Sequence, residues 1–243
     1  MRETMGIIDA HCHLPAEDIG RMLTDMDACG VERAVVCPER RHIVVDNAGG
    51  NDLVAKAQRL HPDRLTGLAV ANPWYGARAV SELRRAREMG LTGLKINSAI
   101  QGFSLLDPMV KPLIAFAAEA GWPVYCHTGT PVHALPMQVC ELAELFPGVD
   151  FVLGHCGFCD SWNDITEAVR RCPRVYLETS YVNPSQLTTY LEAAGRGRML
   201  FGSDAPHSSL SWEVAKAREI EASPEILADV LGGNAERLFW RRP

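Results

Sequence analysis

Two histidines lie two residues apart at the end of the first apolar stretch, Gly6-Ile7-Ile8-Asp9-Ala10-His11-Cys12-His13. Successive side chains of a β-strand point to opposite faces, so His11 and His13 should point the same way and Cys12 the other way. Two imidazoles at one strand end can hold a metal ion. An exposed polar strand end would explain the same residues, so the interpretation depends on partners elsewhere in the chain.

Other apolar strands end in residues that bind metals or titrate, namely Lys95, His127, His155 and Asp204. In a (β/α)8 barrel the carboxyl ends of the strands meet at one mouth, which brings residues far apart in sequence into one site. Three neutral imidazoles and one carboxylate suit Zn²⁺ or another divalent ion, with one position left open for water or substrate.

The elements that would position these residues alternate along the chain. Eight apolar runs predict strands at 6–11, 33–37, 65–71, 92–96, 123–127, 151–155, 175–179 and 199–202. Amphipathic patterns predict helices at 17–28, 51–60, 77–89, 109–120, 137–145, 161–171, 184–194 and 211–221. Eight strand–helix units predict a closed (β/α)8 barrel. An open doubly wound sheet is the alternative, but the first strand is not followed by a Gly-rich dinucleotide turn.

Composition narrows the class of protein. The 243 residues are 47% hydrophobic and 22% charged, with a formal net charge of −6. This predicts one domain over 1–243 with a C-terminal helical cap at about 223–243, and it disfavours nucleic acid as a partner. No apolar run is long enough for a membrane span and no signal peptide is visible, so we expect a cytoplasmic protein whose eight cysteines are reduced. Most of the cysteines are expected to be small core residues. Cys156-x-x-Cys159 could be half a zinc site or a redox pair, but no second Cys-x-x-Cys completes a zinc site and the motif does not open a thioredoxin-like helix, so neither interpretation is favoured.

The chain resembles the amidohydrolase superfamily. The similar motifs span nearly the whole chain in family order: Ile8-Asp9-Ala10-His11-Cys12-His13, Gly93-Leu94-Lys95-Ile96, Cys126-His127-Thr128-Gly129, Gly154-His155-Cys156-Gly157, Gly202-Ser203-Asp204-Ala205-Pro206-His207 and Gly233-Asn234-Ala235-Glu236-Arg237-Leu238-Phe239. Within the superfamily the chain is most similar to the branch that includes aminocarboxymuconate-semialdehyde decarboxylase and small-acid lactonases.

The resemblance implies a role for each strand-end residue. His11, His13 and His127 would be metal ligands. Asp204 would bind the metal and take the proton from its bound water, whose pKa the ion lowers. His155 would be the general acid/base beside that water.

The resemblance and the sequence also single out Lys95, Asp9 and Glu178. Lys95 matches a lysine that, when carboxylated, bridges two metals in binuclear relatives; in the one-metal branch it orients substrate or supports the site. We favour one ion and leave two open. Asp9 is expected to orient a ligand or to close the barrel floor instead of binding the metal. Glu178 could support a ligand or be purely structural.

Positive side chains on the loops at the predicted mouth suit an anionic substrate. Arg40 and Arg41 follow the second strand, and His133 and His207 lie on later loops. Paired hydrogen bonds from such groups could hold a carboxylate, although solvated loop charges would look the same in sequence. Relatives are often homodimers, which makes a homodimer an expectation here as well.

These features predict a metal-dependent hydrolase whose activated water attacks an ester, lactone or amide carbonyl of a small anionic substrate. The alternative is a nonoxidative decarboxylase of an aromatic or unsaturated acid at the same site, with His155 handling the proton. Familiar decarboxylases of this branch carry larger insertions around the mouth, which favours hydrolysis for a chain of 243 residues. A non-catalytic metal-binding barrel is the third hypothesis.

Overall fold

The computed structural model describes residues 6–15, 18–158 and 162–240. Eight parallel strands follow one another around a barrel, and each pairs with the next in sequence order. Their bounds are β1 Ile7–His13, β2 Val31–Cys37, β3 Leu65–Val70, β4 Gly93–Ile96, β5 Val124–His127, β6 Phe151–Gly154, β7 Val175–Glu178 and β8 Met199–Leu200. The predicted (β/α)8 barrel is confirmed.

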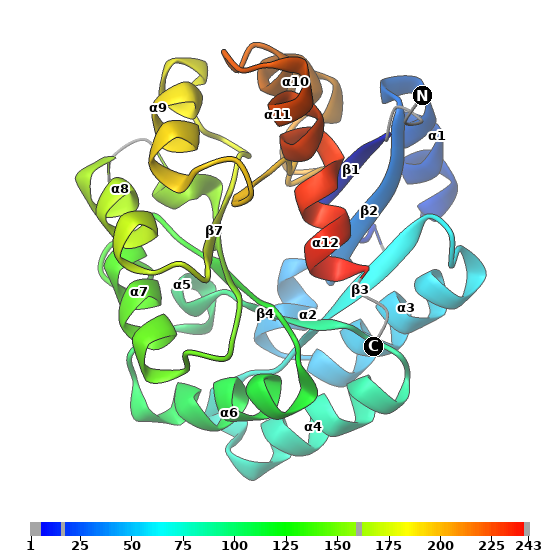
Figure 1. The fold of residues 1–243 in the computed structure, drawn as a ribbon. Coiled ribbons are helices and arrows are strands. Elements are labelled where there is room, and N and C mark those ends of the chain that lie inside the picture. The colour runs from blue at the N-terminus through cyan, green and yellow to red at the C-terminus, as the bar shows by residue number, and fades with distance from the viewer. Residues whose placement is uncertain (1–5, 16–17, 159–161, 241–243) are drawn as a thin grey trace.

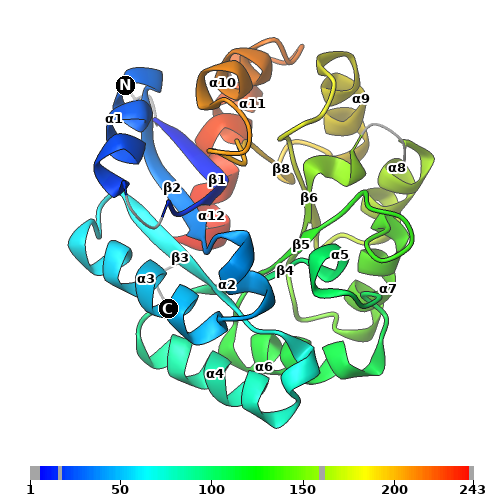
Figure 2. The same ribbon diagram turned by 180° about the vertical axis from the view of Figure 1, so that it is seen from behind.

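Helices surround the strands (Figures 1 and 2). The α-helices are α1 Ile19–Cys29, α2 Arg40–Val44, α3 Asn47–Leu60, α4 Ala77–Glu88, α5 Ser98–Gln101, α6 Lys111–Ala120, α7 Pro136–Leu145, α8 Trp162–Arg171, α9 Pro184–Ala194, α10 Leu210–Arg218, α11 Pro224–Ala228 and α12 Asn234–Phe239. Short turns are η1 Pro73–Tyr75, η2 Pro108–Val110, η3 His155–Gly157 and the π-helical η4 Asp229–Gly233. No helix in the described ranges is long and apolar enough to cross a membrane.

Local sequence signals explain where the helices begin and end. The Asp18 side chain caps α1 by accepting from the Arg21 amide, and Gly30 ends the helix with a φ of 70°. Asn183 and Pro184 start α9 in the same manner, since a capping side chain precedes a proline whose missing N–H costs nothing there.

The barrel closes through the segment after β8. The Ala10 amide donates to the Phe201 carbonyl at 2.8 Å, and the Asp204 amide donates to the His11 carbonyl at 2.8 Å. These backbone bonds place Asp204 directly beside the end of β1.

The C-terminal helix α12 fills one end of the barrel. Ala235, Leu238 and Phe239 pack with interior side chains such as Ile8 and Val35. Figure 1 views this end, with α12 crossing in front of the strands, and Figure 2 views the opposite end, where α2 and α5 lie. The division of the chain into one domain with a cap at about 223–243 stays a prediction.

Several predicted boundaries differ from the structure. Arg40 and Arg41, expected on a loop, begin α2. His155, expected in β6, lies in η3 with a φ of 62°, because the strand ends at Gly154. The eighth strand is only Met199–Leu200. The expected helix start at Ser161 falls outside the described residues.

One pair of cysteines departs from the expectation of reduced thiols. Cys140 of α7 and Cys172, just after α8, form a disulfide. The other described cysteines are free, and all of these except Cys29 are buried. Cys159 lies outside the described residues, so the Cys156-x-x-Cys159 interpretations stay predictions.

Candidate metal centre and active site

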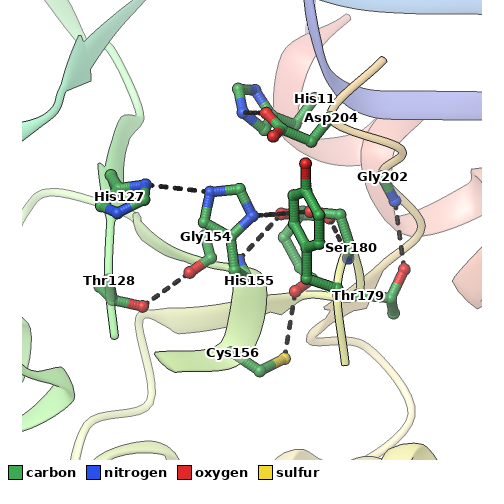
Figure 3. Close-up of polar contacts among 12 residues, drawn as sticks. His11, His127, Thr128, Gly154, His155, Cys156, Thr179, Ser180, Gly202 and Asp204 are labelled. Atoms are coloured by element: carbon green, nitrogen blue, oxygen red, sulfur yellow. Dashed lines mark hydrogen bonds and ion pairs between the residues drawn. The ribbon is translucent and has the colours of Figure 1, made fainter. Parts of the chain in front are cut away.

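A carboxylate and two imidazoles converge where β1 meets the segment after β8. Asp204 Oδ1 lies 2.8 Å from His11 Nε2 and 3.2 Å from His13 Nε2. All three side chains are buried, and Figure 3 shows His11 and Asp204 facing one another. Nitrogen and oxygen atoms about 3 Å apart have the spacing of neighbouring ligands around one divalent ion.

The electrostatics of Asp204 fit a ligand. Burial raises the pKa of this carboxyl, but hydrogen bonds from His11 and His13 outweigh burial and hold it well below its ordinary value. The side chain is therefore a carboxylate at neutral pH. Asp204 also has a φ of 53°, a left-handed conformation that few non-glycine residues adopt and that often occurs at functional sites. An anionic oxygen between two imidazoles meets the ligand chemistry of Zn²⁺, Mn²⁺ and similar ions.

Asp9 ties the two halves of this cluster together. Its Oδ1 accepts from the amides of His11 and Ser203, each at 3.0 Å, and its Oδ2 accepts from the Ser203 hydroxyl. Burial raises the pKa of Asp9 to about 7. Asp9 thus holds β1 beside the Asp204 loop, which is consistent with the expected role of orienting a ligand.

A second pair of histidines lies across the barrel mouth. His127 Nδ1 is 3.1 Å from His155 Nε2. Figure 3 shows this contact between the two rings as a dashed line. His155 Nδ1 lies 2.7 Å from Ser180 Oγ, and that hydroxyl donates to Glu178 Oε2 at 2.9 Å. Because the Ser180 hydroxyl donates its only proton to Glu178, its oxygen must accept a hydrogen bond from His155 Nδ1–H. The free lone pair of His155 is therefore on Nε2.

Glu178 is a buried centre of hydrogen bonds at the end of β7. It accepts from the Tyr125 hydroxyl at 2.6 Å and from the backbone amides of His155 and Ser180 at 3.0 and 2.6 Å. Gly154 leaves the space that the Tyr125 ring occupies, since a Cβ at position 154 would collide with that ring. Glu178 therefore fixes the position of the His155 turn.

Burial keeps both histidines of this pair neutral. Burial and the charge of Lys95 lower the pKa of His127 to about 3. Burial and the neighbouring His127 hold the pKa of His155 well below its ordinary value. At neutral pH each imidazole has a lone pair available for a proton or a metal.

Lys95 extends into the barrel interior and is almost fully buried. Its Nζ lies 3.3 Å from His11 Nε2 and 4.0 Å from the centre of the Tyr125 ring. Burial lowers the pKa of this amine. Lys95 thus contacts a predicted metal ligand, as both of its expected roles require. Whether Lys95 bridges two metals or supports a one-metal site stays a prediction.

The predicted metal ligands are not all equally close to one another. Ligand atoms of His11, His155 and Asp204 all lie within 4.8 Å of one another. His127 belongs to no such cluster of three within the described ranges; it contacts His155 and Thr130 Oγ1, the latter at 3.1 Å. The structure therefore brings His155 closer to the first cluster than the sequence resemblance implied.

The four predicted substrate contacts differ in position. His207 Nε2 lies 3.4 Å from Glu39 Oε2, and its ring centre is 4.8 Å from that of His13. Arg40 is exposed at the start of α2, next in sequence to the Glu39 that His207 contacts. Arg41 is exposed on α2. His133 contributes its backbone carbonyl, which accepts from Ser98 Oγ at 2.9 Å.

Two aromatic residues of the site were missed by sequence reasoning. Phe158 stacks on His155 with 5.1 Å between ring centres, and Tyr181 lies edge-on to His155 at 5.6 Å. The Tyr181 hydroxyl hydrogen-bonds the Asp204 carboxylate. Both residues have positive φ, which side-chain type alone does not signal for an aromatic residue.

Cys37 was also missed, because buried cysteines were taken as core residues. It ends β2, and its Sγ lies 3.5 Å from His13 Nδ1. Burial raises the pKa of this thiol, but the charges of His13 and His11 outweigh burial and lower it to about 5. The apolar run Ala34-Val35-Val36 ending in a ligand-type residue was the available signal.

A cavity of about 670 Å³ opens between α1 and the segment that joins β8 to α10. Its lining includes His13, Arg21, Met22, Pro206 and Ser208. This volume is in the range of small-molecule sites.

Known proteins place these features in a family. The sequence matches the amidohydrolase family over residues 8–241. The chain is 24% identical over 250 residues to gamma-resorcylate decarboxylase of Rhodococcus jostii, an alignment that covers 80% of this chain and 75% of the relative.

Two solved structures share the fold. The 5-carboxyvanillate decarboxylase of Sphingomonas paucimobilis has a TM-score of 0.76 and 21% identity, covering 92% of this chain and 83% of that one. The dihydroxybenzoic acid decarboxylase of Polaromonas sp. JS666, with bound manganese and the inhibitor 2-nitroresorcinol, has a TM-score of 0.74 and 18% identity, covering 97% of each chain.

These comparisons correct the predicted reaction. All three proteins are named as decarboxylases, so the prediction of a metal-dependent hydrolase is wrong and the alternative is the better supported of the two. The physical reason is that both reactions can use the same strand-end residues, so the ligand pattern did not distinguish them. The resemblance itself is confirmed: the chain is an enzyme of the amidohydrolase superfamily, and it belongs to the amidohydrolase family over nearly its whole length.

Proposed function

We propose that this enzyme is a nonoxidative decarboxylase of a small aromatic carboxylic acid and that it uses a divalent metal ion. The observation that carries the proposal is the position of His155. It lies against Phe158 and Tyr181 on one side and within reach of His11 and Asp204 on the other. An aromatic acid placed there would have a planar surface to stack on and a proton carrier at its edge. The three similar decarboxylases support this substrate class.

His11, His13 and Asp204 would hold the ion, with His127 on the opposite side of the site. A divalent ion bound there supplies positive charge that attracts the carboxylate of the substrate. Arg40 and His207 at the mouth add positive charge and a hydrogen-bonding group. We propose one divalent ion, zinc or manganese, at this position.

His155 would move the proton. Ser180 and Glu178 fix the hydrogen on Nδ1, so Nε2 is the nitrogen that takes a proton and returns it. Nε2 would take one proton from solvent and give it to the ring carbon that loses its carboxylate, and the electron pair of the broken carbon–carbon bond forms the new carbon–hydrogen bond. The products are carbon dioxide and the decarboxylated ring, so atoms and charges balance without an oxidant.

Carbon dioxide release from a panel of hydroxybenzoates tests the proposal. The metal-loaded enzyme should release one carbon dioxide for each ring product. His155→Gln should lower kcat by about 10²- to 10⁴-fold, the range for a lost general acid/base. His61→Gln, at the C-terminal end of α3 outside the site, is the matched control and should keep full activity. Absence of carbon dioxide with every aromatic acid, or full activity of His155→Gln, would refute the reaction.

A further inference from the structure

The last residue of β2, Cys37, points into the barrel instead of toward the surrounding helices. Its side chain is fully buried and packs with interior residues such as Val35 and Tyr125. In the strand register Cys37 pairs with His13 of β1. The thiol therefore lies at the same level of the barrel as a predicted metal ligand.

The hydrogen bonds of His13 show which of its two ring nitrogens could bind a metal ion. Its Nδ1 lies 2.8 Å from the Pro38 carbonyl oxygen, which can only accept, so Nδ1 carries the hydrogen. Nε2, which lies 3.2 Å from Asp204 Oδ1, is therefore the nitrogen that can bind an ion once it gives up its proton. Cys37 Sγ is 3.9 Å from this Nε2. Zn–N and Zn–S bonds are about 2.0 and 2.3 Å, so two such atoms on one ion lie at most about 4.3 Å apart.

A third side chain joins the pair. Three possible ligand atoms, one from each of His11, His13 and Cys37, lie within 4.8 Å of one another. All three residues are buried. Independently, His11 Nδ1 is buried without a hydrogen-bond partner among the described residues. A buried unpaired nitrogen is costly, so the hydrogen bonding of His11 is incomplete without a further ligand in this cluster.

Cys126 shows that a buried strand-end cysteine need not lie in this position. It precedes His127 near the end of β5 and is equally buried, but its side chain packs in the outer core between the strands and the helices. Packing therefore explains Cys126, whereas the interior position of Cys37 adds a soft ligand atom to a cluster of imidazoles.

We propose that Cys37 is a sulfur ligand of the divalent ion bound at His11 and His13. The inference rests on the proposed function only for the presence of that ion. The sulfur bonds to the metal as thiolate, and any protons that the bonding atoms of Cys37, His11 and His13 still carry are released to solvent. A thiolate makes the site softer, so this enzyme should prefer zinc or cobalt over manganese more strongly than a site built only of nitrogen and oxygen ligands.

Cobalt(II) added to the metal-free full-length protein tests the ligand set without turnover. The wild type should show a sulfur-to-cobalt charge-transfer band in the near ultraviolet, together with d–d bands in the visible. Cys37→Ser should lose the charge-transfer band and keep the d–d bands, because the other ligands still bind the ion. Cys126→Ser is the buried control and Cys29→Ser the partly exposed one; both should keep the charge-transfer band.

The other outcomes of the cobalt experiment distinguish failure of the sulfur ligand from failure of the proposed function. A wild-type protein with d–d bands but no charge-transfer band, or a Cys37→Ser variant that keeps that band, overturns the sulfur ligand and leaves the decarboxylase proposal standing. A protein that binds no cobalt overturns both. Decarboxylation is measured separately as carbon dioxide release, so loss of that reaction with an intact sulfur band would refute only the function.

A second measurement covers the case in which Cys37→Ser does not fold. X-ray absorption at the zinc edge of the wild-type protein should detect one sulfur atom at about 2.3 Å from the metal. A zinc shell of nitrogen and oxygen alone would overturn the inference. Where Cys37→Ser does fold, competition titrations should show its ratio of zinc to manganese affinity reduced about tenfold or more, and an unchanged ratio would contradict the proposal.

Discussion

His127 and His155 face each other across 3.1 Å, from Nδ1 of the first to Nε2 of the second. Because His155 Nδ1–H donates to Ser180, His155 Nε2 accepts from His127 Nδ1–H. His127 Nε2 is left to accept from the Thr130 hydroxyl at 3.1 Å. One directional chain of hydrogen bonds therefore joins the ends of β5, β6 and β7 in the absence of substrate, and it requires both imidazoles to be neutral.

The neutral state of His127 makes the stability of the metal-free protein depend on pH. Its pKa falls from 6.5 to about 3 on folding, so between these values the unfolded chain binds a proton that the native protein does not. The stability contribution is complete above about pH 6.5 and is lost as the pH falls toward 3, at about 1.4 kcal/mol per pH unit. His127→Gln should have a shallower slope in urea unfolding measured from pH 4 to 7. Parallel slopes for the two proteins would contradict this account.

Ser180 should position His155 without touching substrate. Ser180→Ala removes the acceptor that holds the hydrogen on His155 Nδ1, so the wrong tautomer becomes populated. We expect kcat to fall about tenfold to a hundredfold with KM nearly unchanged, and Ser180→Thr to restore part of the rate. Ser185→Ala, on the exposed start of α9, is the control. A loss confined to KM would show that Ser180 acts on binding instead.

Removing the Asp9 carboxylate should loosen the junction between β1 and the Asp204 loop. Asp9→Ala leaves the amides of His11 and Ser203 without their acceptor in a buried site, at a cost of about 3 kcal/mol. Asp9→Asn keeps one oxygen for both amides and should cost about 1 kcal/mol. Urea unfolding measures both, with Asp27→Ala as an exposed control whose effect should stay near 0.5 kcal/mol. Equal losses for Asp9→Ala and Asp27→Ala would contradict the role of Asp9.

The Cys140–Cys172 disulfide should stabilise the pairing of α7 with α8. It closes a loop with a sequence separation of 32, for which the loss of unfolded-state entropy corresponds to about 3 to 4 kcal/mol. Adding reductant should therefore lower the free energy of unfolding of the wild type by this amount. Cys140→Ser should be less stable and insensitive to reductant. A wild type whose unfolding does not respond to reductant would show that the two thiols are not linked in solution.

What the sequence by itself determined is the order of the elements and the residues at their ends. Apolar runs bounded by helical patterns predicted eight strands, and His11, His13, His127 and Asp204 could be placed at one mouth because parallel strands of a barrel end on the same side. These are local signals, since burial on both faces of a strand produces a continuous apolar run. The same local pattern supports more than one reaction, which is why hydrolysis was predicted.

Only the tertiary structure decided which side chains of different strands touch. The contact of Cys37 with His13, the Ser180 link between His155 and Glu178, and the approach of Tyr181 to Asp204 all cross between elements. They depend on strand register and on the left-handed backbone at His155, Tyr181 and Asp204, which the residue types themselves disfavour. Surrounding packing imposes such conformations, so no local pattern in the chain announces them.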